Sequence, residues 1–290
     1  MRIGMVGLGR MGGNMATRLR RHGHEVVGYA KDPAGSDVAS LEGLVAALDG
    51  GPKVVWVMVP AGDPTEETVV GLSGLLAAGD VVVDGGNSNY RDSMRRAELL
   101  GAHGIGFVDA GVSGGIWGLD EGYCLMVGGA EDTVEGLRPA FEALAPPGGF
   151  AHVGPVGAGH FTKMIHNGVE YGLMQAFGEG YELLERSELG IDVDGALRAW
   201  RHGSVVRSWL LELLVRAVDE DPGLASIRGY AEDSGEGRWT VAEAVRLGVP
   251  APVISSALFA RFASRQEDST AMRVVAALRA QFGGHAARAR

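Results

Sequence analysis

A glycine-rich segment close to the start of the chain constrains the fold more than any other feature. Its residues stand between an apolar run at residues 3–6 and a stretch with helical periodicity, and they are Gly7, Leu8, Gly9, Arg10, Met11 and Gly12. Where a GxGxxG segment joins a strand to a helix, its glycines allow a tight turn, close approach of a pyrophosphate and close packing of helix on strand. The segment therefore predicts a dinucleotide site. In a chain with 47 glycines, a turn without a ligand is the alternative.

Short β-rich runs alternate with helix-length segments through the first half of the chain. The expected strands are residues 3–6, 25–29, 54–59, 81–84 and 106–109, with 124–127 and 150–153 added at the end. Several are apolar throughout, which is typical of parallel strands buried on both faces. Helical periodicity then takes over, with helices expected at residues 160–189, 240–247 and 254–264. The pattern predicts an α/β Rossmann-type doubly wound sheet in residues 1–155, the dinucleotide-binding domain, followed by an all-α C-terminal domain in residues 156–290.

The end of the second expected strand bears on the choice between NAD and NADP. An acidic residue there would bind the ribose hydroxyls of NAD, whereas a basic residue would favour the additional phosphate of NADP. Ala30 stands where the acid is first expected, Lys31 is a candidate phosphate partner, and Asp32 is a displaced candidate for the ribose. These signals conflict and favour NADP only slightly. Lys31 and Asp32 could equally form a solvated turn.

Composition limits the partners of the chain. The net charge of −10 argues against general nucleic-acid binding, although a few cations in one cleft can still bind an anionic small molecule. No segment approaches the roughly 20 apolar residues of a membrane span, and the N-terminus lacks the pattern of a signal peptide. With one cysteine, Cys124, no intramolecular disulfide can form. We expect a cytoplasmic protein with no nucleic-acid or membrane partner. We expect no metal site, since only His22 and His24 stand close together.

Four polar residues share one face of the long helix expected from residue 160. Lys163, His166, Asn167 and Glu170 stand at i, i+3, i+4 and i+7. Oxidation of a hydroxyl needs a base, and a lysine can serve if its surroundings lower its pKa. Once the ketone lies β to a carboxylate, carbon dioxide leaves and an acid must protonate carbon, which a glutamic acid can do. The alternative is a solvent-exposed polar stripe, although such stripes favour Lys, Glu and Arg over His and Asn.

These residues resemble the active-site helix of 6-phosphogluconate dehydrogenase, a family of the β-hydroxyacid dehydrogenase superfamily. The resemblance extends over nearly the whole chain, through segments at residues 58–62, 84–88, 111–115, 157–171, 235–240 and 258–261. The length and the single helical region are similar to the family's short form. One departure is Arg238, which stands where longer members have a phosphate-binding lysine. A planar fork there replaces a point charge, so the form of the phosphate contact stays open.

The resemblance implies a role for each matching residue. Lys163 would take the hydroxyl proton, Glu170 would protonate the enol, and His166 and Asn167 would complete the catalytic set. Further cofactor contacts would come from Val59, Pro60 and Asn87. The carboxylate and hydroxyls of the substrate would be held by Asn87, Ser113, Gly114, Gly115, His166 and Asn167, and its phosphate by Tyr171, Arg238, Thr240 and Arg261. Judged without the resemblance, Asn87 could simply belong to a turn, and residues 113–115 could form an ordinary loop. Arg238 and Arg261 could be solvated side chains.

The resemblance also implies shared active sites. Arg279 and His285 match an arginine and a histidine that reach into the partner subunit's site, so we expect a homodimer or homotetramer that shares C-terminal residues. A frayed basic tail is the alternative.

The implied activity is oxidative decarboxylation of a sugar-acid phosphate, 6-phosphogluconate, with reduction of NADP or NAD. A sibling enzyme acting on an unphosphorylated substrate such as 3-hydroxyisobutyrate would share the fold and the lysine. It would not need Arg238, Arg261, Arg279 and His285 to converge on a phosphate. A catalytically silent dinucleotide-binding protein is the alternative of another class, and the Lys163–Glu170 pair argues against it.

Overall fold

The computed structural model describes residues 1–32 and 35–283, with side chains described up to residue 281. The chain divides into two compact units, residues 1–166 (unit 1) and residues 167–290 (unit 2), and the division falls inside one long helix. The sequence predicts the boundary between residues 155 and 156, before that helix.

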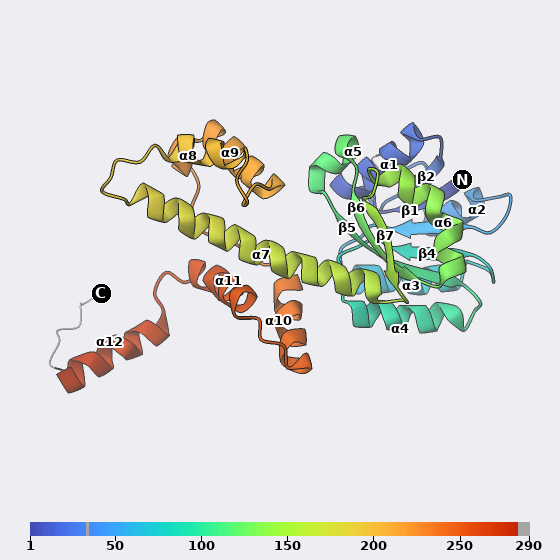
Figure 1. The fold of residues 1–290 in the computed structure, drawn as a ribbon. Coiled ribbons are helices and arrows are strands. Elements are labelled where there is room, and N and C mark those ends of the chain that lie inside the picture. Colours follow the sequence, from blue (N-terminus) through green and yellow to red (C-terminus); the bar gives the residue numbers. More distant parts are fainter. Residues whose placement is uncertain (33–34, 284–290) are drawn as a thin grey trace. The chain divides into compact units, whose positions relative to one another are not determined.

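Unit 1 is a seven-stranded sheet with helices between the strands (Figure 1). The strands are β1 (Arg2–Val6), β2 (Glu25–Tyr29), β3 (Val54–Val57), β4 (Val81–Asp84), β5 (Gly106–Ser113), β6 (Cys124–Gly129) and β7 (Phe150–Gly154). The helices are α1 (Arg10–Arg21), α2 (Leu41–Ala47), α3 (Asp63–Ser73), α4 (Tyr90–Gly101), α5 (Gly118–Glu121) and α6 (Glu131–Leu144), with the short 3-10 helix η1 (Gly115–Trp117). The prediction of an α/β doubly wound sheet is confirmed.

The strand order places the expected ligand site beside the glycine-rich segment. The sheet runs β2-β1-β3-β4-β5-β6-β7. Strands β1 to β5 are parallel, β6 is antiparallel to β5, and β7 is parallel to β6. The chain passes from β1 to β2 on one side and then returns to β3 on the other. In open sheets of this kind, ligands bind outside the carboxyl ends of the strands at that reversal, and Gly7 directly follows β1 there.

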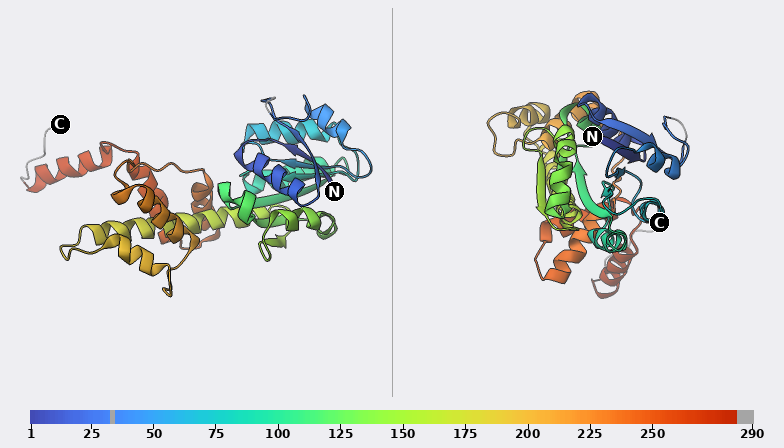
Figure 2. Two further views of the ribbon diagram at one scale, coloured as in Figure 1. Left: turned by 90° about the horizontal axis from the view of Figure 1, so that it is seen from above. Right: turned by 90° about the vertical axis from the view of Figure 1, so that its right-hand side faces the viewer.

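Helices cover both faces of the sheet, as a doubly wound fold requires (Figure 2), and apolar side chains are buried on both faces. On one face, Met15 and Leu19 of α1 and Phe141 of α6 pack with Trp56 of β3. On the other face, the packed side chains come from α2, α3 and α4, and they include Leu44, Leu72 and Leu100. These two layers fix the positions of the loops that leave the carboxyl ends of the strands.

Several element ends differ from the predicted ones. Strand β3 ends at Val57 rather than at residue 59, because the chain turns toward Pro60, which cannot donate to a ladder. Strand β5 continues to Ser113 because antiparallel β6 pairs with its second half. The long helix α7 (Ala158–Glu185) stops four residues earlier than predicted, where the Ser187 hydroxyl accepts from the N–H of Leu189 in a local turn.

Unit 2 is all α-helical, which confirms the predicted class of the second half. It holds the second part of α7 and then α8 (Val193–Trp200), α9 (Trp209–Glu220), the 3-10 helix η2 (Pro222–Leu224), α10 (Glu236–Leu247), α11 (Pro252–Ser264) and α12 (Thr270–Gly283). Helices α8 and α9 pack around Leu197 and Leu211, and Tyr171 of α7 packs on Leu258 of α11. Within the residues that the structure describes, no helix is long and apolar enough to cross a bilayer.

Candidate active site

The glycine-rich segment forms a backbone cradle at the carboxyl end of β1. Gly7 has a φ of +95°, and a Cβ there or at Gly12 would collide with the carbonyl oxygen of Met58 or of Gly7 itself. A Cβ at Gly9, by contrast, would meet nothing within 4 Å. Gly9 is also the N-cap of α1 and gives the helix no side-chain cap. The open side of Gly9 and the uncapped N–H groups of α1 fit a pyrophosphate, and the predicted residues from Gly7 to Gly12 come together here.

Two further predicted loops border this cradle. The carbonyl oxygen of Pro60 accepts from Thr65 Oγ1 at 2.8 Å, which fixes the start of α3. A Cβ at Gly86 would lie 3.0 Å from the carbonyl oxygen of Val59, so the loops after β3 and β4 are in close contact. The structure thus brings the loop of Val59 and Pro60 next to the loop that contains Asn87.

The residues after β2 are more exposed. The Nζ atom of Lys31 lies 3.5 Å from Glu67 Oε2, and 83% and 68% of the two side chains are exposed. The N–H of Ala30 donates to Ser36 Oγ at 3.0 Å, and that hydroxyl lies 3.3 Å from the carbonyl oxygen of Asp32. Lys31 is therefore in a position where an additional phosphate could reach it, with Glu67 as a competing partner. Glu67 and Ser36 were not singled out from the sequence.

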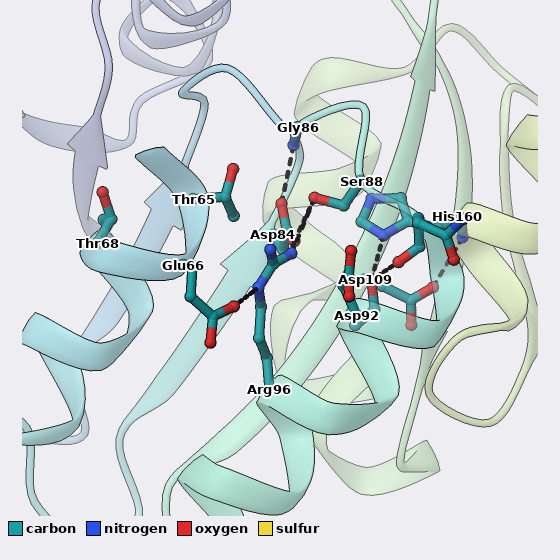
Figure 3. A network of polar contacts seen from close by, with 12 residues as sticks. Thr65, Glu66, Thr68, Asp84, Gly86, Ser88, Asp92, Arg96, Asp109 and His160 are labelled. Atoms are coloured by element: carbon teal, nitrogen blue, oxygen red, sulfur yellow. Dashed lines mark hydrogen bonds and ion pairs between the residues drawn. The ribbon is translucent and has the colours of Figure 1, made fainter. Parts of the chain in front are cut away.

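A buried ionic network supports the Asn87 loop (Figure 3). The Arg96 side chain is 1% exposed and donates to Asp84 Oδ2 at 3.2 Å, to Ser88 Oγ at 3.1 Å and to Glu66 Oε2 at 3.0 Å. The Ser88 hydroxyl donates to Asp84 Oδ2 at 2.8 Å, and the N–H of Gly86 donates to Asp84 Oδ1 at 3.1 Å. Asn87 thus lies between two anchored neighbours. Sequence reasoning missed Arg96, because a helical arginine gives no local sign that it is buried.

Unit 1 also brings predicted substrate residues next to the start of α7. Ser113 ends β5, and its Oγ atom lies 3.4 Å from Nε2 of His166. Lys163 is 7% exposed, and its stem lies against Gly111, where a Cβ would collide with it. Gly114 and Gly115 follow with φ values of +129° and +55°, which strongly favour glycine. Asn167 and Glu170 continue the same uninterrupted helix, so the i to i+7 spacing holds along α7.

Two of the predicted phosphate residues, Arg261 and Tyr171, are in direct contact in unit 2. The Arg261 guanidinium carbon lies 3.5 Å from the centroid of the Tyr171 ring, and Arg261 Nη1 donates to the carbonyl oxygen of Glu232 at 2.8 Å. The Tyr171 hydroxyl accepts from the N–H of Ser234 at 3.1 Å. Thr240 is 3% exposed, and its hydroxyl donates to the carbonyl oxygen of Glu236 at 2.9 Å.

One acid holds two arginines beside this group. Asp233 Oδ2 accepts from Arg238 Nε at 2.6 Å, and Asp233 Oδ1 accepts from Arg238 Nη2 at 3.1 Å and from Arg265 Nη1 at 2.8 Å. The hydrogen bond from Arg238 is the main cause that lowers the pKa of Asp233 to about 2, and Arg265 adds to it. Asp233 thus accepts hydrogen bonds from Nε and Nη2, along one edge of the Arg238 guanidinium. The N–H groups of Nη1 and the second N–H of Nη2 are the ones that could bind an anion. Asp233 and Arg265 were not predicted from the sequence.

Two further predicted residues, Arg279 and His285, lie near the C-terminus. Arg279 lies on α12 and is exposed, whereas His285 lies outside the described residues. Among the described residues, no group of three or more His, Cys, Asp or Glu side chains could hold a metal ion.

Both halves of the chain match known protein families. Residues 2–154 match the NAD binding domain of 6-phosphogluconate dehydrogenase, and residues 159–286 match the 6-phosphogluconate dehydrogenase C-terminal domain. A Haloferax volcanii protein named as an NAD(+)-dependent, decarboxylating 6-phosphogluconate dehydrogenase is 42% identical over 98% of both chains.

Solved structures of two enzymes have a similar fold. Plasmodium falciparum 6-phosphogluconate dehydrogenase, described with NADP+ and with 6-phosphogluconate, has a TM-score of 0.83 at 26% identity over 97% of this chain and 65% of its own. Mycobacterium tuberculosis 3-hydroxyisobutyrate dehydrogenase has a TM-score of 0.74 at 27% identity over 96% of this chain and 99% of its own.

Proposed function

This chain belongs to the 6-phosphogluconate dehydrogenase family, whose members are NAD(P)-dependent decarboxylating dehydrogenases, and on that premise we propose that it converts 6-phosphogluconate into ribulose 5-phosphate and carbon dioxide. The observation that supports this substrate most strongly is the arginine cluster of unit 2. Arg238 and Arg265 both pair with Asp233 and lie over the ring of Phe262, and Arg261 lies over the ring of Tyr171. An acid such as 3-hydroxyisobutyrate has a carboxylate but no phosphate, so it offers these cations no second anionic group to bind.

The proposed chemistry uses residues of α7. Lys163 takes the proton of the substrate hydroxyl as its C–H hydrogen leaves with an electron pair, and the bound nicotinamide supplies the acceptor for that hydride. The product is a ketone β to the carboxylate. As carbon dioxide leaves, the electron pair of the broken C–C bond moves toward the carbonyl oxygen, and Lys163 returns its proton to that oxygen, which gives an enol. Glu170 then protonates carbon while Lys163 takes back the O–H proton, which gives the ketone product. Lys163 is buried and its stem lies against Gly111, next to the loop of Ser113, which supports the proposed position of this residue beside the substrate.

Binding roles follow from the same groups. We assign the substrate carboxylate and hydroxyls to Ser113, Gly114, Gly115, His166 and Asn167, with Asn87 between substrate and cofactor. The Ser113–His166 contact supports this assignment. The phosphate is assigned to Tyr171, Arg261, Thr240 and the outward N–H groups of Arg238.

We propose NADP over NAD as the preferred cofactor, on the position of Lys31 after β2. The relative from Haloferax volcanii is named NAD(+)-dependent, so the assay must compare both. Purified protein is incubated with 6-phosphogluconate and either cofactor, and absorbance of the reduced nicotinamide is followed together with release of carbon dioxide. Reduction with stoichiometric carbon dioxide supports the proposal. Oxidation of 3-hydroxyisobutyrate but not of 6-phosphogluconate would move the function to the sibling enzymes.

We further propose that the chain works as a homodimer or homotetramer with shared C-terminal residues. Helix α12 exposes several large apolar side chains, namely Met272, Val274, Val275 and Leu278, with exposed fractions between 45% and 62%. Arg279 stands next to Leu278 on the same helix. Apolar surface of this kind is typical of subunit contacts. Light scattering of the purified protein would give the mass, and a monomer that retains full activity would contradict this part of the proposal.

A further inference from the structure

A buried carboxylate on β5 holds the first turn of α7. Asp109 is 0% exposed, and its two carboxylate oxygens accept from the N–H groups of Gly157 and His160, each at 2.7 Å (Figure 3). N–H groups at the start of a helix have no partner within the helix, and a negative charge there is stabilised by the helix dipole. Asp109 thus supplies from the sheet what an N-cap side chain ordinarily supplies from within the same segment.

The clamped turn leads directly to Lys163, which is three residues after His160. Helix and sheet meet here through glycines, so their backbones lie close together. A Cβ at Gly159 would collide with the carbonyl oxygen of Asp109, and a Cβ at Gly111 would collide with the stem of Lys163. A Cβ at Gly128 would lie 2.5 Å from Asp109 Oδ1. The Asp109 carboxylate and these close glycine contacts together hold the turn that precedes Lys163.

A second set of hydrogen bonds connects the first turn of α7 to the Asn87 loop. The His160 ring is 1% exposed, and its Nδ1 lies 2.7 Å from Ser93 Oγ, which lies 3.3 Å from the carbonyl oxygen of Asn89. If Ser93 donates to Asn89, the Nδ1–H of His160 donates to Ser93. Nε2, which has no hydrogen-bond partner in the described structure, then carries a lone pair rather than an unsatisfied N–H. The start of α7 and the end of the Asn87 loop are thereby joined through side chains.

The charge of Asp109 is costly to bury. Burial raises the pKa of the Asp109 carboxyl, and the backbone donors of His160 and Gly157 only partly offset this. A second buried aspartate, Asp80, offers a direct comparison. It is 5% exposed and accepts from the N–H groups of Lys53 and Ala77 at 2.7 and 2.8 Å, at the amino end of β4 and away from the proposed site. Each carboxylate accepts hydrogen bonds from two backbone N–H groups. Asp109 does so from within β5, and Asp80 does so at the amino end of β4.

We propose that Asp109, His160 and Ser93 form a positioning clamp that sets the reactive geometry of Lys163 relative to the Asn87 loop. This clamp acts through Lys163 and touches no substrate, and the proposal rests on the proposed role of Lys163 as the base. Because misplacement of a reacting group by about 1 Å can reduce turnover about 100-fold, loss of the clamp lowers kcat far more than it alters substrate binding.

The test compares Asp109→Asn with Asp80→Asn in the full-length protein. An asparagine places an NH2 group against one backbone N–H in either case, so both variants lose thermal stability to a similar degree. We expect kcat of Asp109→Asn to fall by about 10- to 100-fold with the KM values of substrate and cofactor within about threefold of wild type. We expect kcat of Asp80→Asn to stay within about twofold. The deuterium isotope effect at the oxidised carbon rises only in Asp109→Asn, because the chemical step becomes slower.

Equal kcat values in the two variants would overturn the proposal. If Asp109→Asn does not fold, the Ser93→Ala variant tests the clamp instead. It removes the hydroxyl that contacts His160 and leaves Asp109 intact. A raised isotope effect in that variant supports the clamp, and wild-type kcat with a wild-type isotope effect overturns it. Failure of the proposed function is seen separately in the wild type, as no turnover of 6-phosphogluconate. The same variants are then compared on whichever β-hydroxy acid is oxidised.

Discussion

The Arg261 guanidinium lies over the ring of Tyr171, with 3.5 Å between its central carbon and the ring centroid. The ring and the carbonyl oxygen of Glu232 together fix the guanidinium, so its remaining N–H groups are oriented before a ligand arrives. A lysine at this position would keep the charge but lose both the stacking and the fork.

Arg261→Lys should therefore raise KM for 6-phosphogluconate by about 10- to 100-fold, as expected for one charge-assisted hydrogen-bond pair, with little change in KM for the cofactor. Arg228→Lys is the matched control, since Arg228 also lies over a tyrosine, Tyr230, but is exposed and paired with Glu267. Steady-state kinetics of both variants decide. Equal KM values for wild type and Arg261→Lys would remove Arg261 from the phosphate site.

Asp233 makes stability depend on pH in the acid range. The lowered pKa, about 2 in the folded protein, means that the unfolded chain binds more protons between about pH 4 and pH 2. The contribution of Asp233, on the order of 1–2 kcal/mol after solvent screening of its arginines, is fully present above about pH 4 and is lost as pH falls toward 2. Denaturant unfolding of wild type and Asp233→Asn should show a gap that closes over this range. Asp268→Asn, which removes an exposed acid, should show a smaller gap; a gap for Asp233→Asn that is independent of pH would contradict the assignment.

Gly111→Ala should reduce both stability and activity. The added methyl group would meet the stem of Lys163 and would lie 2.9 Å from the carbonyl oxygen of Gly159. Overpacking of this kind costs about 1–3 kcal/mol, and the resulting shift of Lys163 should lower kcat by at least about 10-fold. Gly136→Ala is the control, because a Cβ there meets nothing within 4 Å on α6 and should be neutral or stabilising. Thermal unfolding and kcat are measured for both. Full activity in Gly111→Ala would show that Lys163 tolerates displacement.

Arg96→Met should destabilise the protein strongly. It leaves Asp84, which is 0% exposed, without its cationic partner, and breaking one side of a buried pair costs about 3–5 kcal/mol. The neighbouring variant Arg95→Met removes an exposed side chain bound to Glu66 and should cost less than about 1 kcal/mol. Urea unfolding of the two variants tests the difference. Similar stabilities would mean that the network is not what holds the Asn87 loop.

Lys31 should control the choice of cofactor. We expect Lys31→Ala to lower kcat/KM for NADP by about 10-fold, the value of one charged hydrogen bond, and to leave that for NAD unchanged. Glu67→Gln should act in the opposite direction, because it removes the competing partner at 3.5 Å. Lys53→Ala, at the start of β3, should change neither ratio. A parallel loss with both cofactors in Lys31→Ala would mean that Lys31 does not read the additional phosphate.

The class of both halves could be predicted from the sequence because it depends on local periodicity. Apolar runs followed by turn residues specify buried parallel strands, and residues 7–12 specify the turn from β1 into α1. The family could also be identified, since its segments are contiguous in the sequence. The roles of Lys163, Glu170 and the other site residues stay predictions. The ends of β3, β5 and α7 were placed wrongly, because a neighbouring strand, a proline or a local turn decides where an element stops.

The sequence by itself thus determined the α/β class, the all-α second half, the family and the list of candidate residues. Only the tertiary structure decided which side chains hold those candidates in place. Asp109 meets the N–H of Gly157 across 48 residues, and Arg96 turns inward to Asp84 while Arg95 stays at the surface. The physical reason is that periodicity shows which face of an element is apolar, whereas the partner of a buried charge is fixed by how sheet and helices pack, through contacts between residues far apart in the chain.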